Sequence, residues 1–499
     1  MDALSLARIQ ASLQALQGSY AYLFPEWVLA ASFLALVLLS AFPSGRGFLP
    51  WLSGIGILVS GLCLVWGPLG AGSSWQGMLW LDHLSRWGRG LLLFTGLVTI
   101  VWMGREPKRH FRPETYPMLM ALLLGSMLMT MAAHLLLMYL SLELVSISSY
   151  LLTVHRRSKR PAAEAAMKYI IFGAFSSALM LYGISWWYGL TGSLRLDQVE
   201  VILSLNQFPV ETQLLVLGLI LAGLLFKIAA VPLHFWAPDI YQGTSFPVAT
   251  FFSIVPKAGG LLMLIHLLKL TQSLDSFAEI QVIILMVAIA SMSLGNLAAL
   301  WQTDLKRLLA YSSIAQSGFM LMAAACRSET GEAAALFYLS IYLMMNLSVF
   351  IIAAALGRSV KSQNIEDLDG LAFKFPISTV AITIGLVALV GLPPTSGFIG
   401  KWYILMAGID QVSQGYPTLW VITLALAVIN TVISLFYYLR IPARMVLRPM
   451  AKQEESSTPL PTWVWIGILM AIPTLVLGFL GFDEVMNLIQ VGLWNPIDN

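Results

Sequence analysis

Apolar segments long enough to cross a lipid bilayer recur along almost the whole of this chain. A bilayer offers no partners to backbone N–H and C=O groups, so a crossing segment forms a helix of about 20 residues. With a mean hydropathy of +0.80 over 499 residues, no sizeable soluble domain fits beside these segments. The sequence predicts an all-α polytopic membrane protein with about 14 transmembrane helices, near residues 22–42, 50–68, 87–104, 116–133, 135–154, 163–189, 212–236, 246–269, 280–300, 307–325, 333–356, 376–407, 418–440 and 462–482.

Basic residues are distributed unevenly between the connections on the two sides of these segments. Cytoplasmic loops of membrane proteins carry the excess of Lys and Arg. The connections after the odd-numbered segments hold eighteen basic residues, whereas the other side, with the N-terminal stretch, holds six. We therefore expect both termini on the non-cytoplasmic side. The first 24 residues lack the features of a cleaved signal peptide, so we expect them to be retained.

Four lysines remain inside the apolar segments after the basic residues of the connections are assigned, and among the acids only Glu143 lies near the middle of a segment. A lysine at membrane depth costs about 2.5–3.5 kcal/mol on insertion scales, so it marks a transport pathway or a pairing site. The sequence therefore points to a transport function and a working set of one acid and four lysines, namely Glu143, Lys168, Lys227, Lys257 and Lys401.

Glu143 and Lys227 form the most suggestive pair in this set. Glu143 has no charged neighbour within a turn of its own helix, so it is either protonated or paired with a base from another helix. Lys227 is the natural partner, because it is the most central cation of its segment. Burial disfavours the charged form of a lysine, and a nearby carboxylate favours it. A change in the separation of the pair would therefore make the lysine hold or release its proton. The alternative is a structural ion pair that only fixes helix packing.

Proline interrupts the segment that carries Lys227. The stretch 221–260 contains Pro232, Pro238, Pro247 and Pro256, and broken helices at membrane depth occur where protein or a water-filled cavity satisfies the freed carbonyls. His234 follows the first break and titrates nearest neutrality, so it is either a relay group or a ligand for these carbonyls.

The remaining lysines lie in three other segments. Lys257 lies in the middle of its segment, directly after Pro256. Lys401 follows a second break at Pro393-Pro394, where glycines suit close backbone approach. Lys168 lies only about two turns from a basic loop, so it either belongs to the relay or extends its long side chain to the membrane surface.

A weak internal repeat relates two blocks of five helices. EAAMKY at 164–169 and EAAALF at 332–337 open corresponding helices, and the breaks fall in helices 7 and 12. Because the two blocks are offset by five helices, an odd number, the second block has the inverted membrane topology. Inverted repeats with broken helices in matching positions are a transporter architecture. We expect an N-terminal three-helix segment (1–115), a first repeat of helices 4–8 (116–270), an inverted second repeat of helices 9–13 (271–445), and helix 14 with the C-terminal tail (446–499).

Three stretches resemble a known family. PLHFWAPDIYQGTSFPVATFFSIVPKAGG, TDLKRLLAYSSIAQSGFMLM and GLPPTSGFIGKWYIL resemble the antiporter-like membrane subunits of proton-pumping quinone oxidoreductases, the complex I type. HFWAPDIYQG followed by FPV looks like the N-type branch, also called subunit 2. EAAMKYIIFGAFSSALMLYGISWWYGLTGSLRL looks most like cyanobacterial and plastid versions of that branch.

The resemblance implies a proton-translocating subunit that carries no electrons. In the family, the residues that match Glu143 and Lys227 form an ion pair, those that match Lys257 and Lys401 continue a hydrophilic axis, and Lys168 matches a further family lysine. A conformational or electrostatic pulse from the quinone site would shift the Glu143–Lys227 pair. Protons would then pass through Lys257 or His234 to Lys401 and leave on the non-cytoplasmic face.

The same resemblance implies particular partners. They are other membrane subunits, further antiporter-like subunits among them, an electron-input arm that acts indirectly, and surrounding lipids. The cyanobacterial likeness implies plastoquinone as acceptor, ferredoxin as donor to the complex and a thylakoid membrane. We expect iron–sulfur clusters, flavin and quinone to bind in partner subunits, because this chain has no clustered cysteines, no GxGxxG before a helix and no paired haem histidines. We expect no metal and no nucleic acid.

Two other functions fit the same residues. A cation/proton antiporter of the Mrp type is a relative of these subunits and would exchange sodium or potassium by itself. A non-pumping scaffold would use the buried charges only to specify assembly.

Overall fold

The fold is described from a computed structural model that places residues 20–68, 72–106, 111–154, 160–413, 416–449 and 459–479. Part of the charge count that predicts the orientation lies outside these described residues, namely Arg8, Lys108, Arg109, Arg156, Arg157, Lys159 and Lys452.

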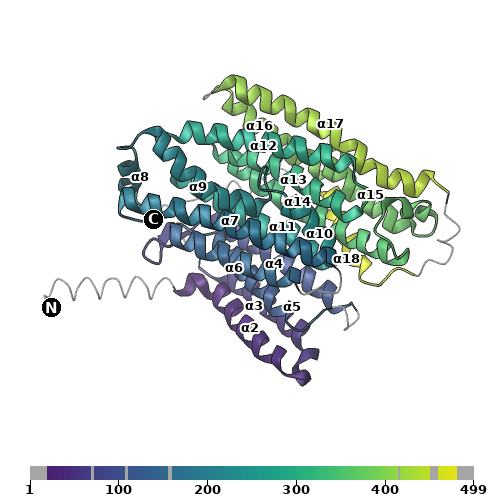
Figure 1. Ribbon diagram of the computed structural model, residues 1–499. Helices are drawn as coiled ribbons and strands as arrows, with labels where there is room; N and C mark the ends of the chain where they lie inside the picture. Colours follow the sequence, from purple (N-terminus) through teal and green to yellow (C-terminus); the bar gives the residue numbers. More distant parts are fainter. Residues whose placement is uncertain are drawn as a thin grey trace.

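The first part of the chain forms helices on one side of the bundle (Figure 1). Its long helices are α2 (Phe24–Ala41), α3 (Leu49–Trp66), α4 (His83–Gly104), α5 (Thr115–Met129), α6 (Leu135–Val154) and α7 (Arg160–Thr191). The short elements are the 3-10 helices η1 (Tyr20–Leu23) and η2 (Pro43–Gly47) and the antiparallel strands β1 (Gly72–Ser74) and β2 (Leu79–Leu81), in which Gly72 pairs with Leu81.

The rest of the chain completes the bundle. The central helices are α8 (Val199–Leu205), α9 (Val210–Ile228), α10 (Trp236–Gly243), α11 (Phe246–Leu270), α12 (Phe277–Leu300), α13 (Leu305–Ala324) and α14 (Glu329–Ser359). They are followed by η3 (Ile365–Leu368), η4 (Leu371–Phe373), α15 (Pro376–Val390), α16 (Ser396–Gln411), α17 (Pro417–Leu447) and α18 (Val464–Val476).

The predicted class, an all-α polytopic membrane protein, is confirmed. Among the described residues, ten helices are long and apolar enough to cross a membrane, and α5, α15 and α18 are shorter apolar helices. Every apolar segment predicted from the sequence contains a helix. The strands β1 and β2 and the helix α8 are too short to produce a periodic pattern, so the sequence did not predict them.

Both predicted helix breaks are present. α9 ends at Ile228, the next residue Ala229 has a left-handed φ of 59°, and α10 begins only at Trp236. α15 ends in the same way at Val390, followed by Gly391 with a φ of 85°, before α16 begins. Each break contains a cis X–Pro peptide bond, at Val231-Pro232 and at Pro393-Pro394. The relation between the two halves as inverted repeats stays a prediction.

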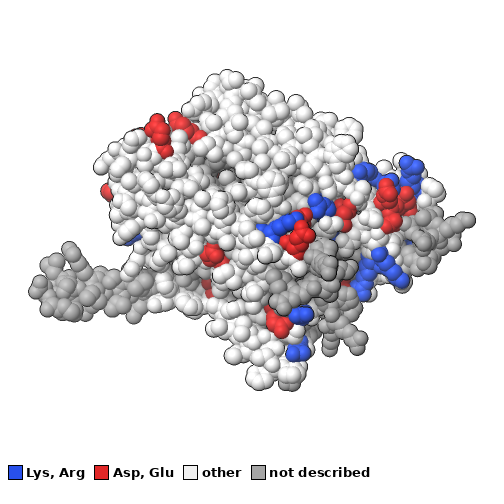
Figure 2. All heavy atoms as spheres, in the orientation of Figure 1, with Lys and Arg blue, Asp and Glu red and all other residues white. Residues whose placement is uncertain are grey.

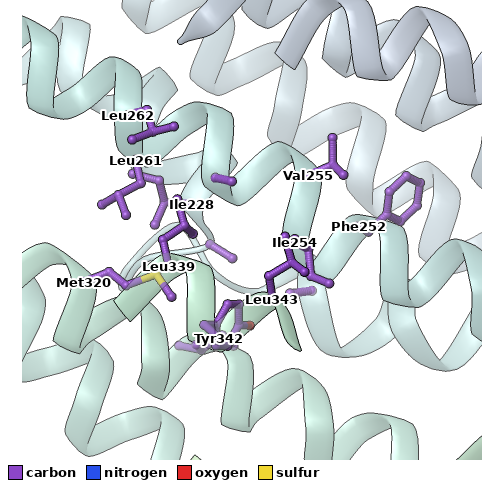
Figure 3. Packing of buried hydrophobic residues seen from close by; sticks show 14 of the residues in the cluster. Ile228, Phe252, Ile254, Val255, Leu261, Leu262, Met320, Leu339, Tyr342 and Leu343 are labelled. Atoms are coloured by element: carbon purple, nitrogen blue, oxygen red, sulfur yellow. The ribbon is translucent and has the colours of Figure 1, made fainter. Parts of the chain in front are cut away.

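Helix α11 lies at the centre of the bundle and places one of the intramembrane lysines there. All of its most apolar 18-residue window is buried, compared with 28% for the peripheral helices α2 and α17. Figure 3 shows apolar side chains of α11, such as Ile254 and Leu261, packed against Met320 of α13 and Leu343 of α14. A charged group on α11 is therefore surrounded by protein and not by lipid.

The outer surface in view is dominated by uncharged residues. Figure 2 shows blue and red atoms gathered mainly on the right side of the molecule, where α10 and α15 lie in Figure 1, with a broad uncharged zone beside them. This distribution is expected of a bundle whose sides face lipid and whose ends face water.

Candidate proton-transfer site

Lys227 lies one residue before the end of α9, in a pocket of aromatic rings. It is fully buried, and its Nζ lies 5.6 Å from the ring centre of Tyr169 and 5.8 Å from those of Tyr150 and Phe226. Nζ has no hydrogen-bond partner among the described residues. Ring faces attract a cation but accept no proton, so this environment holds Lys227 without fixing its protonation state.

Glu143 of α6 lies near this lysine but does not touch it. No ion pair within 4.0 Å joins them, and the buried Oε1 of Glu143 has no hydrogen-bond partner among the described residues. Glu143 is nevertheless close enough to Lys227 for the two side chains to interact electrostatically. The two residues expected to form an ion pair are thus neighbours held apart, and a change of side-chain conformation or a bridging water molecule would be needed to join them.

Lys257 of α11 is held by one face of α13. Its Nζ donates to Ser313 Oγ at 2.5 Å, to the Ser313 carbonyl at 3.1 Å and to Ser317 Oγ at 3.3 Å. Ser313 Oγ lies 2.9 Å from the hydroxyl of Tyr342 and 3.5 Å from that of Tyr241. Lys257 therefore begins a chain of hydroxyl groups that leads away from it across the bundle.

Ser317 connects this chain to the helix that carries Lys227. Its hydroxyl donates to the carbonyl of Ile228 at 3.0 Å, in the last turn of α9. The break leaves this carbonyl without a helical partner. A Cβ on Gly260 would lie 3.1 Å from Ile228 and 3.5 Å from Lys227, so the glycine lets α11 approach α9 closely. The region of the first break thus brings Lys227 and Lys257 to the place where α9, α11 and α13 meet.

Lys401 of α16 folds back onto the second break. Its Nζ donates to the carbonyls of Val390 at 2.8 Å and Leu389 at 3.1 Å, and it lies 4.3 Å from the ring centre of Phe319. Gly391 makes room for it, because a Cβ there would lie 2.8 Å from Lys401 Cδ. A buried lysine thus satisfies the carbonyls that the break exposes.

Gln316 of α13 leads from Lys401 toward Ser313. Its Nε2 donates to the same Leu389 carbonyl at 2.9 Å and to the Tyr438 hydroxyl at 3.2 Å. Its Oε1 accepts from the Tyr338 hydroxyl at 2.5 Å. Gln316 lies three residues, or nearly one turn, from Ser313 on the same helix. The polar face of α13 therefore spans the distance between the groups around Lys257 and Lys401.

His234 lies in the connection between α9 and α10. It is 3% exposed, and its Nδ1 has no hydrogen-bond partner among the described residues. Lys257 lies close enough to interact with it electrostatically. Its position fits both sequence interpretations, a relay group and a group that supports the broken backbone.

Lys168 lies apart from the other lysines. Its side chain is 48% exposed in this chain and pairs with Glu164 at 2.8 Å and with Asp239 at 3.4 Å. Asp239 also pairs with Arg307 at 2.8 Å, so a surface network links α7, α10 and α13. This placement matches the interpretation in which Lys168 reaches the surface of its own subunit.

The structure adds polar groups that the charge count did not find. The sequence places Lys306 in the connection between the apolar segments 280–300 and 307–325, but its side chain is 1% exposed and donates to the Thr244 carbonyl at 2.7 Å. His266 of α11 is fully buried, 3.0 Å from Asp82. The uncharged groups of α13 also escaped the count, although Ser312, Ser313, Gln316 and Ser317 follow the spacing of one helical face.

These groups are able to transfer protons. Amines and hydroxyls can accept one proton and release another, provided that water or side-chain motion closes the gaps between them. Among the described residues, no group of three or more His, Cys, Asp or Glu could hold a metal ion. The site is thus a line of proton donors and acceptors along α9, α11, α13 and α16.

The chain is similar to known proteins over most of its length. Residues 132–434 match the family described as NADH:quinone oxidoreductase/Mrp antiporter, transmembrane. The chain is 36% identical over 466 residues to an NADH-quinone oxidoreductase subunit N 2 of Chloroherpeton thalassium, covering 91% of this chain and 90% of the relative. It is 37% identical over 456 residues to an NAD(P)H-quinone oxidoreductase subunit 2 of Acaryochloris marina, covering 89% and 84%.

A solved structure shows the same architecture. A chain of respiratory complex I from Thermus thermophilus with bound aureothin superimposes with a TM-score of 0.75 and is 29% identical. The similarity covers 93% of this chain and 98% of the other.

Proposed function

This chain belongs to the NADH:quinone oxidoreductase/Mrp antiporter transmembrane family, and from this premise we propose that it is the N-type proton-translocating subunit of a complex I-like quinone oxidoreductase. The observation that carries the proposal is the placement of Lys227, Lys257 and Lys401 inside the bundle, beside two broken helices and along the polar face of α13. The complex as a whole oxidises its donor and reduces quinone, and this chain moves protons.

Proton transfer would begin at the gap between Glu143 and Lys227. A pulse from the quinone site that closes this gap stabilises the charged lysine, and opening the gap favours release of its proton. Ser317 and Ser313 offer the next acceptors toward Lys257, with His234 near them. Gln316, Tyr338 and the carbonyl of Leu389 lead to Lys401, from which protons would leave on the non-cytoplasmic face.

The setting of the complex is a further part of the proposal. Partner membrane subunits, including other antiporter-like subunits, would transmit the pulse, and partner subunits would hold the iron–sulfur clusters and the quinone. The cyanobacterial likeness favours plastoquinone, ferredoxin as donor and a thylakoid membrane with both termini on the lumenal side. A donor assay decides this point: membranes supplied with reduced ferredoxin should reduce plastoquinone through this complex, whereas activity with NADH alone would favour a respiratory setting.

The family also includes Mrp antiporters, so cation exchange is the second candidate. The isolated chain in proteoliposomes should show no sodium- or potassium-dependent proton flux, because its pump would need quinone reduction in the partners. Cation exchange by the isolated chain would favour the antiporter.

The main test uses the assembled complex in proteoliposomes. Lys257→Met removes a proton-carrying amine while keeping the side chain's length. It should leave assembly and the initial rate of quinone reduction in the presence of an uncoupler largely intact, and it should lower the number of protons moved per electron. Lys269→Met is a matched control on the same helix, since Lys269 pairs with Glu332 at 3.0 Å outside the relay. An unchanged proton ratio in Lys257→Met would contradict the proposal.

A further inference from the structure

One end of the bundle contains a cavity of about 290 Å³ that the proton relay does not use. It lies where the end of α4, the first turn of α11, the end of α14 and the start of α18 meet. Its volume is close to the lower limit of about 300 Å³ for small-molecule pockets. The cavity therefore has room for a compact polar group.

The charged groups around the cavity favour an anion. Among the described residues of its lining, Lys306, Arg358 and Lys361 are basic and Glu106 is acidic. Arg358 pairs with Glu106 at 2.7 Å, and the side chain of Lys361 is exposed. The described part of the lining therefore carries two more basic groups than acidic ones.

The first turn of α11 adds to this preference. Ser245, Phe246 and Pro247 line the cavity, and the Ser245 side chain does not cap the helix. The N-terminus of a helix carries a partial positive charge and backbone N–H groups without helical partners, which attract anions. The basic side chains and the uncapped helix thus act in the same direction.

Aromatic rings make the rest of the lining amphipathic. Trp102, Phe111, Phe246 and Trp463 contribute to the walls. Trp102 and Trp463 are buried and pack against each other with ring centres 5.2 Å apart, whereas Phe111 and Phe246 are partly exposed. The cavity therefore joins basic groups to partly exposed aromatic rings.

We propose that this cavity binds the phosphate-bearing headgroup of an anionic membrane lipid. Basic pockets between transmembrane helices bind such headgroups, and about 1 kcal/mol of attraction comes from each basic residue near the surface. The position of the cavity at one end of a membrane-spanning bundle, the level at which headgroups lie, and its partly exposed aromatic rings favour a lipid over a soluble phosphate compound. The bound lipid would join α4, α11, α14 and α18 at one end of the bundle.

The test measures lipid retained by the purified complex. Delipidated complex is incubated in nanodiscs of phosphatidylcholine with or without phosphatidylglycerol, washed in mild detergent, and its bound lipid is quantified by mass spectrometry. Ala354→Phe fills the cavity without changing its charge, since Ala354 lines it and is 6% exposed. Lys361→Gln removes one charge from an exposed position, and Arg46→Gln removes an exposed charge outside the cavity as a control.

The expected result is one tightly held phosphatidylglycerol per copy of this chain in the native complex. Ala354→Phe should lose it, Lys361→Gln should bind it roughly fivefold more weakly, and Arg46→Gln should retain it. If the Ala354→Phe complex does not assemble, the phosphatidylglycerol retained by Lys361→Gln is compared with that retained by Arg46→Gln, and this comparison tests the proposal. Equal retention in Lys361→Gln and Arg46→Gln, equal retention of phosphatidylcholine, or full displacement by inorganic phosphate would each overturn the proposal.

Discussion

The ammonium nitrogen of Lys257 lies 2.5 Å from the hydroxyl oxygen of Ser313, and the other hydrogen-bond partners of this nitrogen also belong to α13. Gln316 of the same helix donates to the Leu389 carbonyl, which also accepts from Lys401. Ser317 donates to the Ile228 carbonyl in the last turn of α9. α13 thus organises the relay although it carries none of the lysines expected to transfer protons.

Replacing Ser313 with alanine should slow proton transfer. The substitution removes a hydrogen bond to a charged group, which contributes about 1.5–3 kcal/mol, and interrupts the link to Tyr342. We expect proton translocation driven by quinone reduction to fall roughly tenfold, while the complex still assembles. Ser40→Ala is the control, because that serine is bonded only within α2. Equal pumping by both variants would exclude Ser313 from the relay.

Replacing Gly391 with alanine should disturb Lys401. The added Cβ would lie 2.8 Å from Lys401 Cδ, and the φ of 85° costs a residue with a side chain about 1–2 kcal/mol. We expect a lower melting temperature for the complex and a reduced proton ratio. Gly218→Ala places its Cβ in open space within α9, so it should be neutral or stabilising. Equal melting temperatures and proton ratios in the two variants would refute this role of Gly391.

Lys168→Gln should have a small effect. Lys168 is half exposed and pairs with two carboxylates, and exposed ion pairs contribute about 0–1 kcal/mol. We expect pumping by this variant to stay near the native value, measured beside Lys257→Met. A loss as large as that of Lys257→Met would place Lys168 in the relay.

Asp197 should make stability depend on pH at one end of the bundle. Burial raises its pKa, but hydrogen bonds from Arg195 and Ser73 outweigh burial and hold the pKa below the usual value. The stabilisation is therefore present above the unfolded-state pKa of about 3.9 and is lost as pH falls through the lower folded-state pKa.

The measurement for Asp197 compares melting temperatures across pH. Asp197→Asn should melt below the native complex at pH near neutrality, and the difference should shrink as the solution becomes more acidic than about pH 4. Asp275→Asn, at an exposed position, is the control. A difference that does not change with pH would show that the Asp197 charge is not involved.

The sequence predicted the groups whose cost in a membrane is large. Lysines inside apolar segments and prolines within helices are expensive, so Lys227, Lys257, Lys401 and the breaks at Pro232 and Pro393-Pro394 stand out without a structure.

Three features of the site could not be predicted in this way. Ser313 and Gln316 are uncharged, so counting charges does not find them. Lys306 lies beside Arg307 and Asp304 and resembles a loop residue, but α13 begins at Leu305 and turns its side chain inward. The separation of Glu143 from Lys227 is a tertiary feature, because the two residues and the rings around the lysine come from different helices.

The proton ratio of the Lys227→Ala complex tests the central claim most directly. The variant and an Arg105→Ala control, which changes an exposed residue at the end of α4, are assembled, reconstituted into proteoliposomes and assayed for protons moved per electron delivered to quinone. We predict that Lys227→Ala assembles, still reduces quinone when uncoupled, and moves fewer protons per electron than the control. A fully assembled Lys227→Ala complex that pumps at the normal ratio would contradict this account.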